Sequence, residues 1–237
     1  MSHGVSGMML RTRELYDLTH TRACSWLEET EYPWEILGEI STIIRAIGEG
    51  LDPDLYDHPT EDVWIAKSAK VAPTAYIGAP AIIGEGTEVR HGAFIRGSAL
   101  VGDGCVVGNS TELKNCILFD GVQVPHYNYV GDSVLGYKSH MGAGSITSNV
   151  KSDKTPVAVK PAIGYEGVFA PIHTGKKKFG AMLGDFVEVG CNSVLNPGTV
   201  VGRRATIYPL SCVRGTVPAD SILKTGGVIV AREVDHG

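Results

Sequence analysis

Two basic residues, Arg96 and Lys114, are spaced so that a repeating chain would bring their charges together. Each directly follows an aliphatic residue, where neighbouring segments have glycine or alanine. They are separated by three units of a six-residue repeat, each unit here called a hexad. If three hexads make one coil, both cations lie on one side, within reach of a single phosphate or diphosphate. A solvated basic ridge is the alternative interpretation.

His126 is the second candidate for chemistry. Histidine can accept a proton near neutral pH, which the deprotonation of an attacking amine or hydroxyl requires. The residue lies in Val124-Pro125-His126-Tyr127-Asn128-Tyr129, between two irregularities of the repeat described below. Local distortions of a sheet often redirect side chains toward sites. A purely structural histidine is the alternative.

The elements that must position these residues are short strands that follow the hexad period. The period slips by one residue before Leu118 and again before Leu135, and after an interruption it returns from Leu183 to Val213. The first unbroken run has nine aliphatic residues, each six after the last: Ile65, Val71, Ile77, Ile83, Val89, Ile95, Val101, Val107 and Leu113. A period of six fits neither an α-helix nor a simple alternating strand.

Short strands joined by sharp corners explain this period. Each strand points one aliphatic and one small residue inward, and three strands, one from each hexad, close a triangular coil. Residues three hexads apart then lie one strand spacing apart, about 4.8 Å. The pattern predicts an all-β protein built as a parallel β-helix, a form of solenoid.

The period also divides the chain into five predicted segments. Residues 61–149 and 182–217 form the coils, residues 150–181 form an inserted loop rich in lysine, and residues 218–237 form a C-terminal tail. Residues 1–60, which lack the period, form an N-terminal helical segment. The inserted loop is interpreted either as a solvated basic loop or as a segment that captures an anionic substrate.

Helical spacing of apolar residues begins at Pro33 and continues to Leu51, which predicts an α-helix after a weaker helical stretch. A helical cap over the first coil is expected, because the open end of a β-helix must be covered. Docking of a partner or a role in substrate binding is the alternative.

Composition narrows the functional classes. The 237 residues include 30 glycines without a collagen period, and 21 basic against 26 acidic residues give a net charge of −5. No global positive charge favours nucleic-acid binding. No apolar stretch approaches the length of a membrane span or a signal peptide. The five scattered cysteines suit a reducing compartment, so we expect a soluble cytoplasmic protein.

The run from Glu112 to Asn149, with both slips and with His126, resembles one family specifically. It is similar to the acetyltransferase half of bifunctional glucosamine-1-phosphate acetyltransferase/N-acetylglucosamine-1-phosphate uridyltransferase. It also resembles the β-helical C-terminal half of related sugar-1-phosphate nucleotidylyltransferases. The likeness covers roughly residues 61–217. It implies a hexapeptide-repeat acyltransferase, with a left-handed β-helix and a homotrimer whose sites lie between neighbouring prisms.

The resemblance assigns roles around the acceptor. His126 is the general base that deprotonates the amine of glucosamine 1-phosphate, and Glu112 orients it. Arg96 and Lys114 match basic residues that contact phosphate and sugar. Tyr129 matches a residue of the sugar site.

The remaining assignments concern the sugar and the coenzyme. Asn149 matches a sugar-site position, and Lys178 matches a lysine that the family supplies from a loop. Ala143 and Cys191 match residues along the acetyl-CoA channel. Arg232 corresponds to a C-terminal arginine near the coenzyme.

Three positions depart from the family pattern. His140 replaces an asparagine that touches the acceptor, Val150 replaces a tyrosine, and Cys191 replaces a serine. These departures concern the identity of the acceptor more than the type of reaction, because the candidate base and the basic residues are present. We therefore expect an N-acyltransferase that uses acetyl-CoA and acts on an amino-sugar phosphate or a nucleotide amino sugar, in the supply of cell-envelope precursors. The chemistry requires no metal.

No uridylyltransferase activity is expected, because residues 1–60 lack a glycine-rich nucleotide-binding start and are too few for such a domain. Two other functions stay open. One is a scaffold or sensor that binds a sugar phosphate without turnover. The other is a β-helical zinc enzyme similar to carbonic anhydrases, with His91, His126 and His140 as candidate ligands.

Overall fold

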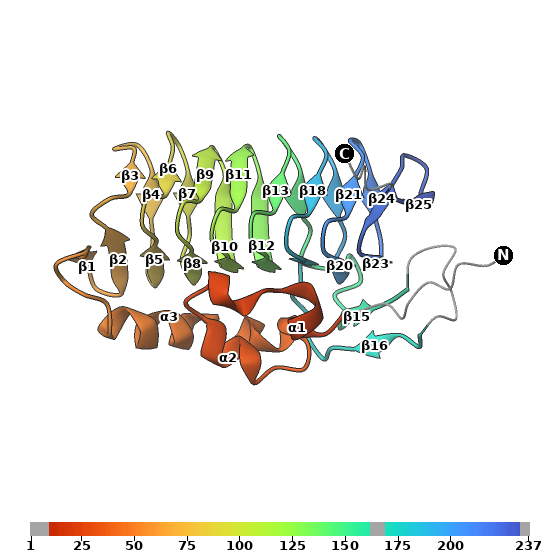
Figure 1. The fold of residues 1–237 in the computed structure, drawn as a ribbon, viewed down its shortest axis with the longest axis horizontal. Helices are drawn as coiled ribbons and strands as arrows, with labels where there is room; N and C mark the ends of the chain where they lie inside the picture. Colours follow the sequence, from red (N-terminus) through yellow and green to blue (C-terminus); the bar gives the residue numbers. More distant parts are fainter. Residues whose placement is uncertain (1–9, 162–168, 233–237) are drawn as a thin grey trace, which may run out of the picture.

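The computed structural model describes residues 10–161 and 169–232, which form a left-handed parallel β-helix with helices along one side (Figure 1). The predicted fold class is confirmed. The first nine residues of the predicted helical segment, residues 162–168 of the predicted loop and residues 233–237 of the predicted tail lie outside the described residues.

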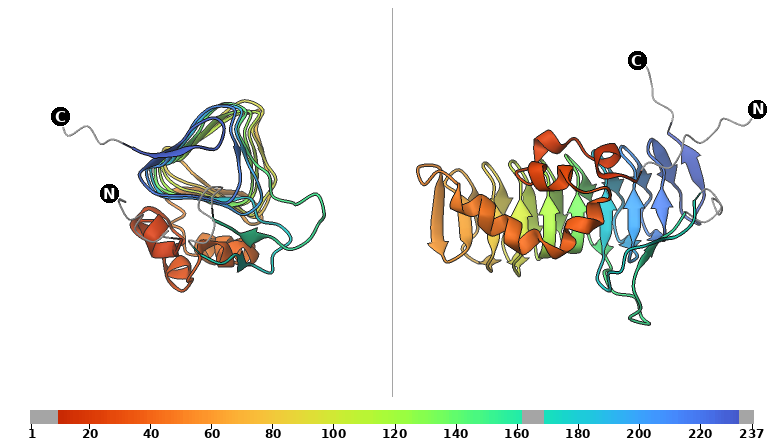
Figure 2. Two further views of the ribbon diagram at one scale, coloured as in Figure 1. Left: turned by 90° about the vertical axis from the view of Figure 1, so that its right-hand side faces the viewer. Right: turned by 90° about the horizontal axis from the view of Figure 1, so that it is seen from below.

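The β-helix is a triangular prism whose coils place one strand on each of three faces (Figure 2). Face 1 consists of β2 (Val63–Ala66), β5 (Ala81–Ile83), β8 (Ala99–Val101), the second halves of β10 (Glu112–Leu118) and β12 (Tyr129–Leu135), β17 (Ala181–Leu183), β20 (Thr199–Val201) and β23 (Thr216–Val217). Face 2 consists of β3 (Lys70–Val71), β6 (Glu88–Val89), β9 (Val106–Asn109), β11 (Gln123–His126), β13 (His140–Met141), β18 (Glu188–Val189), β21 (Thr206–Ile207) and β24 (Ser221–Leu223). Face 3 consists of β4 (Tyr76–Ile77), β7 (Phe94–Ile95), the first halves of β10 and β12, β14 (Ile146–Thr147), β19 (Val194–Leu195) and β22 (Cys212–Val213). The corners between these faces are called edge 1–2, edge 2–3 and edge 3–1.

The two slips in the period are two shortened corners on edge 3–1. Strand partners in the first coils are three full hexads apart, but the coil that joins Leu113 to its partner Val130 is one residue shorter. The shortened corners contain Asn115 and Asp132, with φ angles of 50° and 49°. Asn and Asp tolerate this left-handed conformation better than other side chains. Both β10 and β12 therefore continue through the corner from face 3 to face 1.

Face 1 is apolar on its outer surface as well as its inner one. The outward residues of six successive strands are at most 1% exposed: Ile82, Leu100, Ile117, Val134, Met182 and Val200. The 3-10 helix η2 (Pro33–Gly38) and the helix α3 (Ile40–Glu49) cover the first part of this face, in contact with β5, β8, β10 and β12. The predicted helical segment thus lies along the side of the prism (Figure 1), not over its first coil as expected. The reason is the outer apolar row, which must be covered.

The inserted segment leaves the prism after β14 and lies against the later coils (Figure 2). It contains the antiparallel pair β15 (Ala158–Val159) and β16 (Ile172–His173). Val157 and Val159 are buried. A Cβ at Gly198 would lie 2.6 Å from Cγ1 of Val157, so glycine there allows close contact between the segment and edge 3–1.

Antiparallel strands end the stack of coils. At the first coil, β1 (Tyr56–Thr60) pairs with β2, and at the last, β25 (Ile229–Ala231) pairs with β24. Within residues 10–161 and 169–232, no helix combines the length and hydrophobicity that a membrane crossing requires.

A buried carboxylate on edge 1–2 anchors the chain that precedes η2. This chain contains α1 (Thr12–Leu15), η1 (Leu18–His20) and α2 (Cys24–Glu28). The side chain of Asp185 accepts hydrogen bonds from the backbone N–H groups of Asp17 at 2.7 Å and Tyr137 at 2.9 Å, and from Arg203 at 2.6 Å. Burial raises the pKa of Asp185, although these contacts act in the opposite direction.

Replacing Asp185 by alanine is expected to lower the free energy of unfolding by about 3 kcal/mol, because it leaves Arg203 and two backbone donors without their partner. Urea denaturation followed by circular dichroism measures the loss. The control is Asp220→Asn, which removes the charge from the exposed pair of Arg204 and Asp220 at 2.6 Å and keeps a side chain suited to the left-handed backbone at this position. This control is expected to cost less than about 1 kcal/mol. Equal losses in the two variants would contradict the anchoring role of Asp185.

Candidate functional site

Three of the predicted site residues lie in successive coils on edge 2–3. The N–H of Gly144 donates to the carbonyl of His126 at 3.0 Å, and the N–H of Asn192 donates to the carbonyl of Ala143 at 2.8 Å. These bonds stack the corners that carry His126, Ala143 and Cys191. The side chains of His126 and Cys191 are exposed, and Ala143 is half-buried. The residues predicted as base and as coenzyme contacts thus form one row.

His126 is held at its corner by a buried amide. The side-chain oxygen of Asn128 accepts from the backbone N–H of His126 at 3.1 Å. Its amide nitrogen donates to the carbonyls of Gly142 and Ser145 in the next coil. Asn128 is 2% exposed, so the backbone of the corner is fixed while the His126 side chain faces outward. In this arrangement His126 is accessible to a proton donor.

Arg96 and Lys114 lie in adjacent coils on edge 3–1, across face 3 from His126. The N–H of Arg96 donates to the carbonyl of Leu113 at 2.9 Å, which places the two cations in neighbouring turns. Each has a carboxylate partner. Arg96 Nη1 is 2.8 Å from Glu112 Oε1, and Lys114 Nζ is 3.1 Å from both carboxylate oxygens of Asp132. The two cations are stacked and neutralised by two acids.

Asp132 is a site residue that the sequence did not single out. It is 3% exposed. Besides Lys114, it accepts hydrogen bonds from the side-chain amides of Asn115, at 2.9 Å, and Asn149. It therefore organises Lys114, Asn115 and Asn149. One feature of the sequence could have identified Asp132. It lies at the second slip of the period, in the coil after Lys114.

Tyr129 and Asn149 complete the group on edge 3–1. The amide nitrogen of Asn149 lies 3.2 Å from the phenol oxygen of Tyr129. A Cβ at Gly131 would approach that oxygen closely enough to displace it, so glycine there lets the phenol lie across the edge. Burial is the main cause that raises the pKa of Tyr129, and the nearby charges of Asp132 and Glu112 raise it further. The phenol therefore stays protonated at neutral pH and can donate a hydrogen bond.

The contact of Glu112 differs from the predicted one. Its carboxylate pairs with Arg96, and the hydrogen bond between them raises the pKa of Arg96. On face 3, Glu112 pairs in register with Tyr129 of the next coil. The structure thus brings Glu112 to the cations of edge 3–1 rather than to His126.

The other predicted residues divide between near and remote positions. Lys178 is exposed beside the group, since the N–H of the adjacent Phe179 donates to the carbonyl of Asn149 at 2.9 Å. His140 lies on face 2, with Nδ1 2.9 Å from Glu188 Oε2. Arg232 lies near edge 1–2, where its side chain donates to the Arg204 carbonyl at 3.0 Å. Within one chain, His140 thus lies three residues before Ala143 on the adjoining face, and Arg232 lies near the corner opposite face 3.

The three histidines considered as zinc ligands do not converge within one chain. His91 and His126 do lie two coils apart on edge 2–3, because Asn109 pairs with His126 and its amide donates to the His91 carbonyl. His140 is on face 2. Across the described ranges, no group of three or more His, Cys, Asp or Glu side chains is arranged to hold a metal ion.

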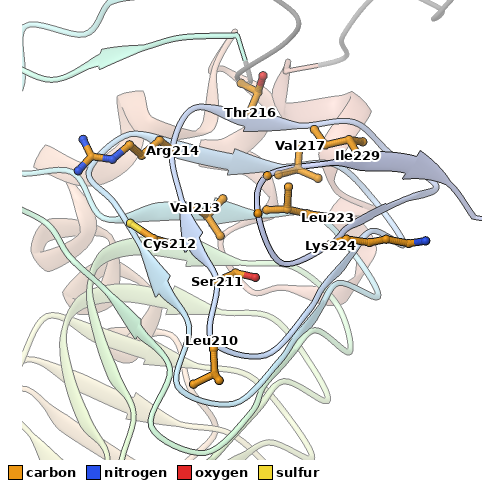
Figure 3. A pocket seen from close by; sticks show the side chains of 12 residues that line it. Leu210, Ser211, Cys212, Val213, Arg214, Thr216, Val217, Leu223, Lys224 and Ile229 are labelled. Carbon is orange, nitrogen blue, oxygen red and sulfur yellow. The ribbon is translucent and has the colours of Figure 1, made fainter.

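One cavity lies away from these residues, at the C-terminal end of the prism (Figure 3). It has a volume of about 310 Å³, and its walls include Val213, Val217, Leu223 and Ile229. Val213, Val217 and Leu223 are the last interior positions of the solenoid. Ile229 belongs to β25, the strand that covers them. Its described lining includes none of the predicted site residues.

Comparison with known proteins supports the interpretation of the motifs. The family described as the GMPPB C-terminal domain matches residues 82–168. A bifunctional sugar-1-phosphate nucleotidylyltransferase/acetyltransferase from Sulfurisphaera tokodaii is 32% identical over 128 residues, 54% of this chain and 26% of its own. The resemblance is confirmed. The bifunctional protein GlmU of Methanococcus maripaludis is 35% identical over 99 residues, 42% of this chain and 22% of its own.

The chain therefore matches about a quarter of the length of these relatives. Among solved structures, the acetyltransferase domain of PglB from Neisseria gonorrhoeae in complex with acetyl coenzyme A aligns with a TM-score of 0.31 and 18% identity. That alignment covers 78% of this chain and 63% of the other. A TM-score of this size supports no conclusion about function.

The two stacked cations are expected to differ in their effect on stability. Lys114→Ala leaves the buried carboxylate of Asp132 without its cation and is expected to lower the free energy of unfolding by about 3 kcal/mol. Arg96→Ala is the control, because Arg96 and Glu112 are both partly exposed, and its melting temperature is expected to stay near that of the wild type. Urea denaturation and thermal melting measure both. A Lys114→Ala protein as stable as Arg96→Ala would show that Asp132 does not depend on Lys114.

Proposed function

We propose that this chain is an N-acyltransferase that transfers an acyl group from CoA to an amino-sugar phosphate or a nucleotide amino sugar. The acyl group proposed is acetyl. The observation that carries the proposal is the arrangement across face 3. An exposed histidine lies on one edge. On the other lie the pair of Arg96 with Glu112 and the hydrogen-bonded group of Lys114, Asp132, Asn149 and Tyr129. The similarity to bifunctional nucleotidylyltransferase/acetyltransferases supports the reaction class.

In the proposed reaction, His126 accepts a proton from the amine of the acceptor as its nitrogen attacks the thioester carbonyl. The new C–N bond forms a tetrahedral intermediate whose oxyanion is stabilised by backbone N–H groups. Collapse of the intermediate breaks the C–S bond, and the departing CoA sulfur takes the proton from His126. The positions of Ala143 and Cys191, in the coils after His126, suit a donor that lies along edge 2–3.

The acceptor would bind toward edge 3–1. Tyr129 offers a protonated phenol, and Asn149 and Lys178 offer donors to sugar hydroxyls or to phosphate. Glu112 and Arg96 are more exposed than Asp132, so a ligand can separate that pair more readily than it can separate Lys114 from Asp132. The proposed steps require no metal ion, because amine attack on a thioester needs a proton acceptor and oxyanion donors.

We further propose a homotrimer with sites between neighbouring prisms. In one chain His140 lies on face 2 and Arg232 near edge 1–2, so a second copy can bring its own His140 and Arg232 to the site. Exposed aromatic rings on face 3 offer a surface for such contact: Tyr76 is 60% and Phe94 43% exposed, with ring centroids 5.6 Å apart. Because CoA thioesters and sugar phosphates are metabolites of the cytoplasm, a cytoplasmic location is part of the proposal.

Replacing His126 by alanine is expected to lower turnover by about 10² to 10⁴ and to leave the melting temperature nearly unchanged, since the side chain is exposed. Thiol release from acetyl-CoA measures turnover. The matched control is His91→Ala, which removes an exposed histidine two coils away on the same edge and is expected to retain activity. Equal turnover in His126→Ala and wild type would remove His126 as the base.

The acceptor is tested by the same assay with a panel of amino-sugar 1-phosphates and nucleotide amino sugars. Thiol release with one class and no uridylyl transfer to any sugar phosphate is the expected result. Binding of an amino-sugar phosphate without thiol release would favour the non-catalytic scaffold or sensor instead.

The oligomer is tested by light scattering after size-exclusion chromatography. The expected mass is three times the 25.2 kDa of one chain. Replacing Tyr76 and Phe94 together by serine is expected to reduce the trimer fraction, whereas Val228→Ser, at an exposed position of the last coil, is expected to leave it unchanged. A wild-type mass of one chain would contradict the trimer.

A further inference from the structure

A second candidate site lies on edge 3–1, in a groove between the inserted segment and the later coils. Its volume is about 820 Å³. The prism side includes Ser148, Asn196 and Arg214, and the inserted segment supplies Lys160 and His173. None of these residues belongs to the site proposed for the transfer reaction.

The groove carries a net positive charge. Lys151, Lys160, His173 and Arg214 all line it, and its described lining contains no aspartate or glutamate. Lys151 is 3.3 Å from the carboxylate of Asp153. The side chains of Lys160, His173 and Arg214 have no ion-pair partner in the described part of the chain. Two unpaired cations on one groove, Lys160 and Arg214, favour a ligand with more than one negative charge.

Part of its wall is apolar, and the inserted segment contacts the prism closely. Three prolines, Pro156, Pro171 and Pro197, line the groove beside the cations. The inserted segment is fixed by the pairing of β15 with β16 and by close contact with the prism. A Cβ at Gly215 would lie 2.5 Å from the carbonyl oxygen of Pro161 and 2.9 Å from that of Lys160. The backbone of Lys160 therefore lies against the corner that carries Arg214.

The groove continues the row of residues that begins with the stacked cations. Strand register places Lys114, Gly131, Ser148, Asn196 and Arg214 at the same corner of five successive coils. At about 4.8 Å per coil, Lys114 and Arg214 are separated along the prism by about 19 Å. Ser148, at the near end of the groove, directly precedes Asn149 of the transfer site. A ligand that extends along this edge can reach both regions.

The two regions differ in charge. At the transfer site, Arg96 and Lys114 are offset by Glu112 and Asp132. In the groove, Lys160 and Arg214 have no such offset within the described residues. An uncharged sugar ring suits the neutral group, whose donors and acceptors match hydroxyls, and phosphates suit the groove. Arg214 lies two coils, about 10 Å, beyond Ser148, so a diphosphate with its nucleoside extends further along the groove than a single phosphate does.

We propose that the groove binds the nucleoside diphosphate part of a nucleotide-activated amino sugar, with the sugar directed toward Asn149 and Tyr129. The phosphates contact Lys160 and Arg214, and the nucleoside lies against the proline walls. This inference rests on the proposed function for the identity of the sugar, and it selects the nucleotide amino sugar from the two acceptors considered. The binding of a nucleoside diphosphate by the groove does not depend on that function.

The test is isothermal titration calorimetry of the full chain with UDP, GDP and ADP, and with inorganic phosphate as the reference ligand. At least one nucleotide is expected to bind at least tenfold more tightly than phosphate. Arg214→Ala and Lys160→Ala are each expected to weaken that binding by about tenfold, and Arg214→Lys by less. Lys224→Ala, which removes an exposed lysine at the C-terminal end, is the control and is expected to bind as the wild type does. Circular dichroism of each variant verifies folding.

Three results would overturn the proposal. The first is that the nucleotides bind no better than phosphate, and the second is that nucleotide binding is unchanged in Arg214→Ala and Lys160→Ala. The third is that CoA binding depends on Arg214 while the binding of UDP, GDP and ADP does not. The last result would assign the groove to the acyl donor. Nucleotide binding that depends on Arg214, in a wild-type chain that releases no thiol from acetyl-CoA, would overturn the transfer reaction and support the groove.

Discussion

Closure of each coil around a column of aliphatic side chains is the constraint on which the rest of this structure depends. Interior residues such as Ile83, Val101 and Leu118 are fully buried and pair directly with one another in neighbouring coils. Once every coil closes after nearly the same length of chain, each outward side chain has a defined neighbour above and below. Rows of functional residues on the edges are a direct consequence.

The same closure leaves one face with apolar residues on both sides. A solenoid strand normally needs to bury only its inner residues, and faces 2 and 3 follow that rule. Face 1 does not, because Ile82, Leu100, Ile117 and the residues below them are also buried on the outside. The helices cover the first part of this surface, and the inserted segment lies against the later coils (Figure 2). Face 3 and edge 2–3 stay open to solvent, whereas η2 and the inserted segment both contact edge 3–1, beside which part of the site lies.

Charge is distributed unevenly along edge 3–1. The first cations of the row meet carboxylates from adjacent positions, Glu112 and Asp132, and form a neutral hydrogen-bonding surface. The last cation, Arg214, meets the basic inserted segment instead. One edge therefore offers two chemically different environments, one suited to a sugar and one suited to phosphates. This separation follows from which residues the coils and the insertion place side by side.

Much of this architecture could be read from the sequence. The hexad period specified the coils, because a buried position admits only apolar side chains, and its two slips marked the corners at Asn115 and Asp132. The stacking of Arg96 on Lys114 and the outward position of His126 followed from the same count. The outer apolar row was visible in the sequence but was not used to predict where the helices lie. Only the tertiary structure decided that Glu112 pairs with Arg96, that Asp132 binds Lys114, and that the insertion returns onto Gly198 and Gly215. A periodic pattern determines which residues are stacked, whereas the partner of a polar side chain depends on its rotamer and on segments distant in the chain, which have no period.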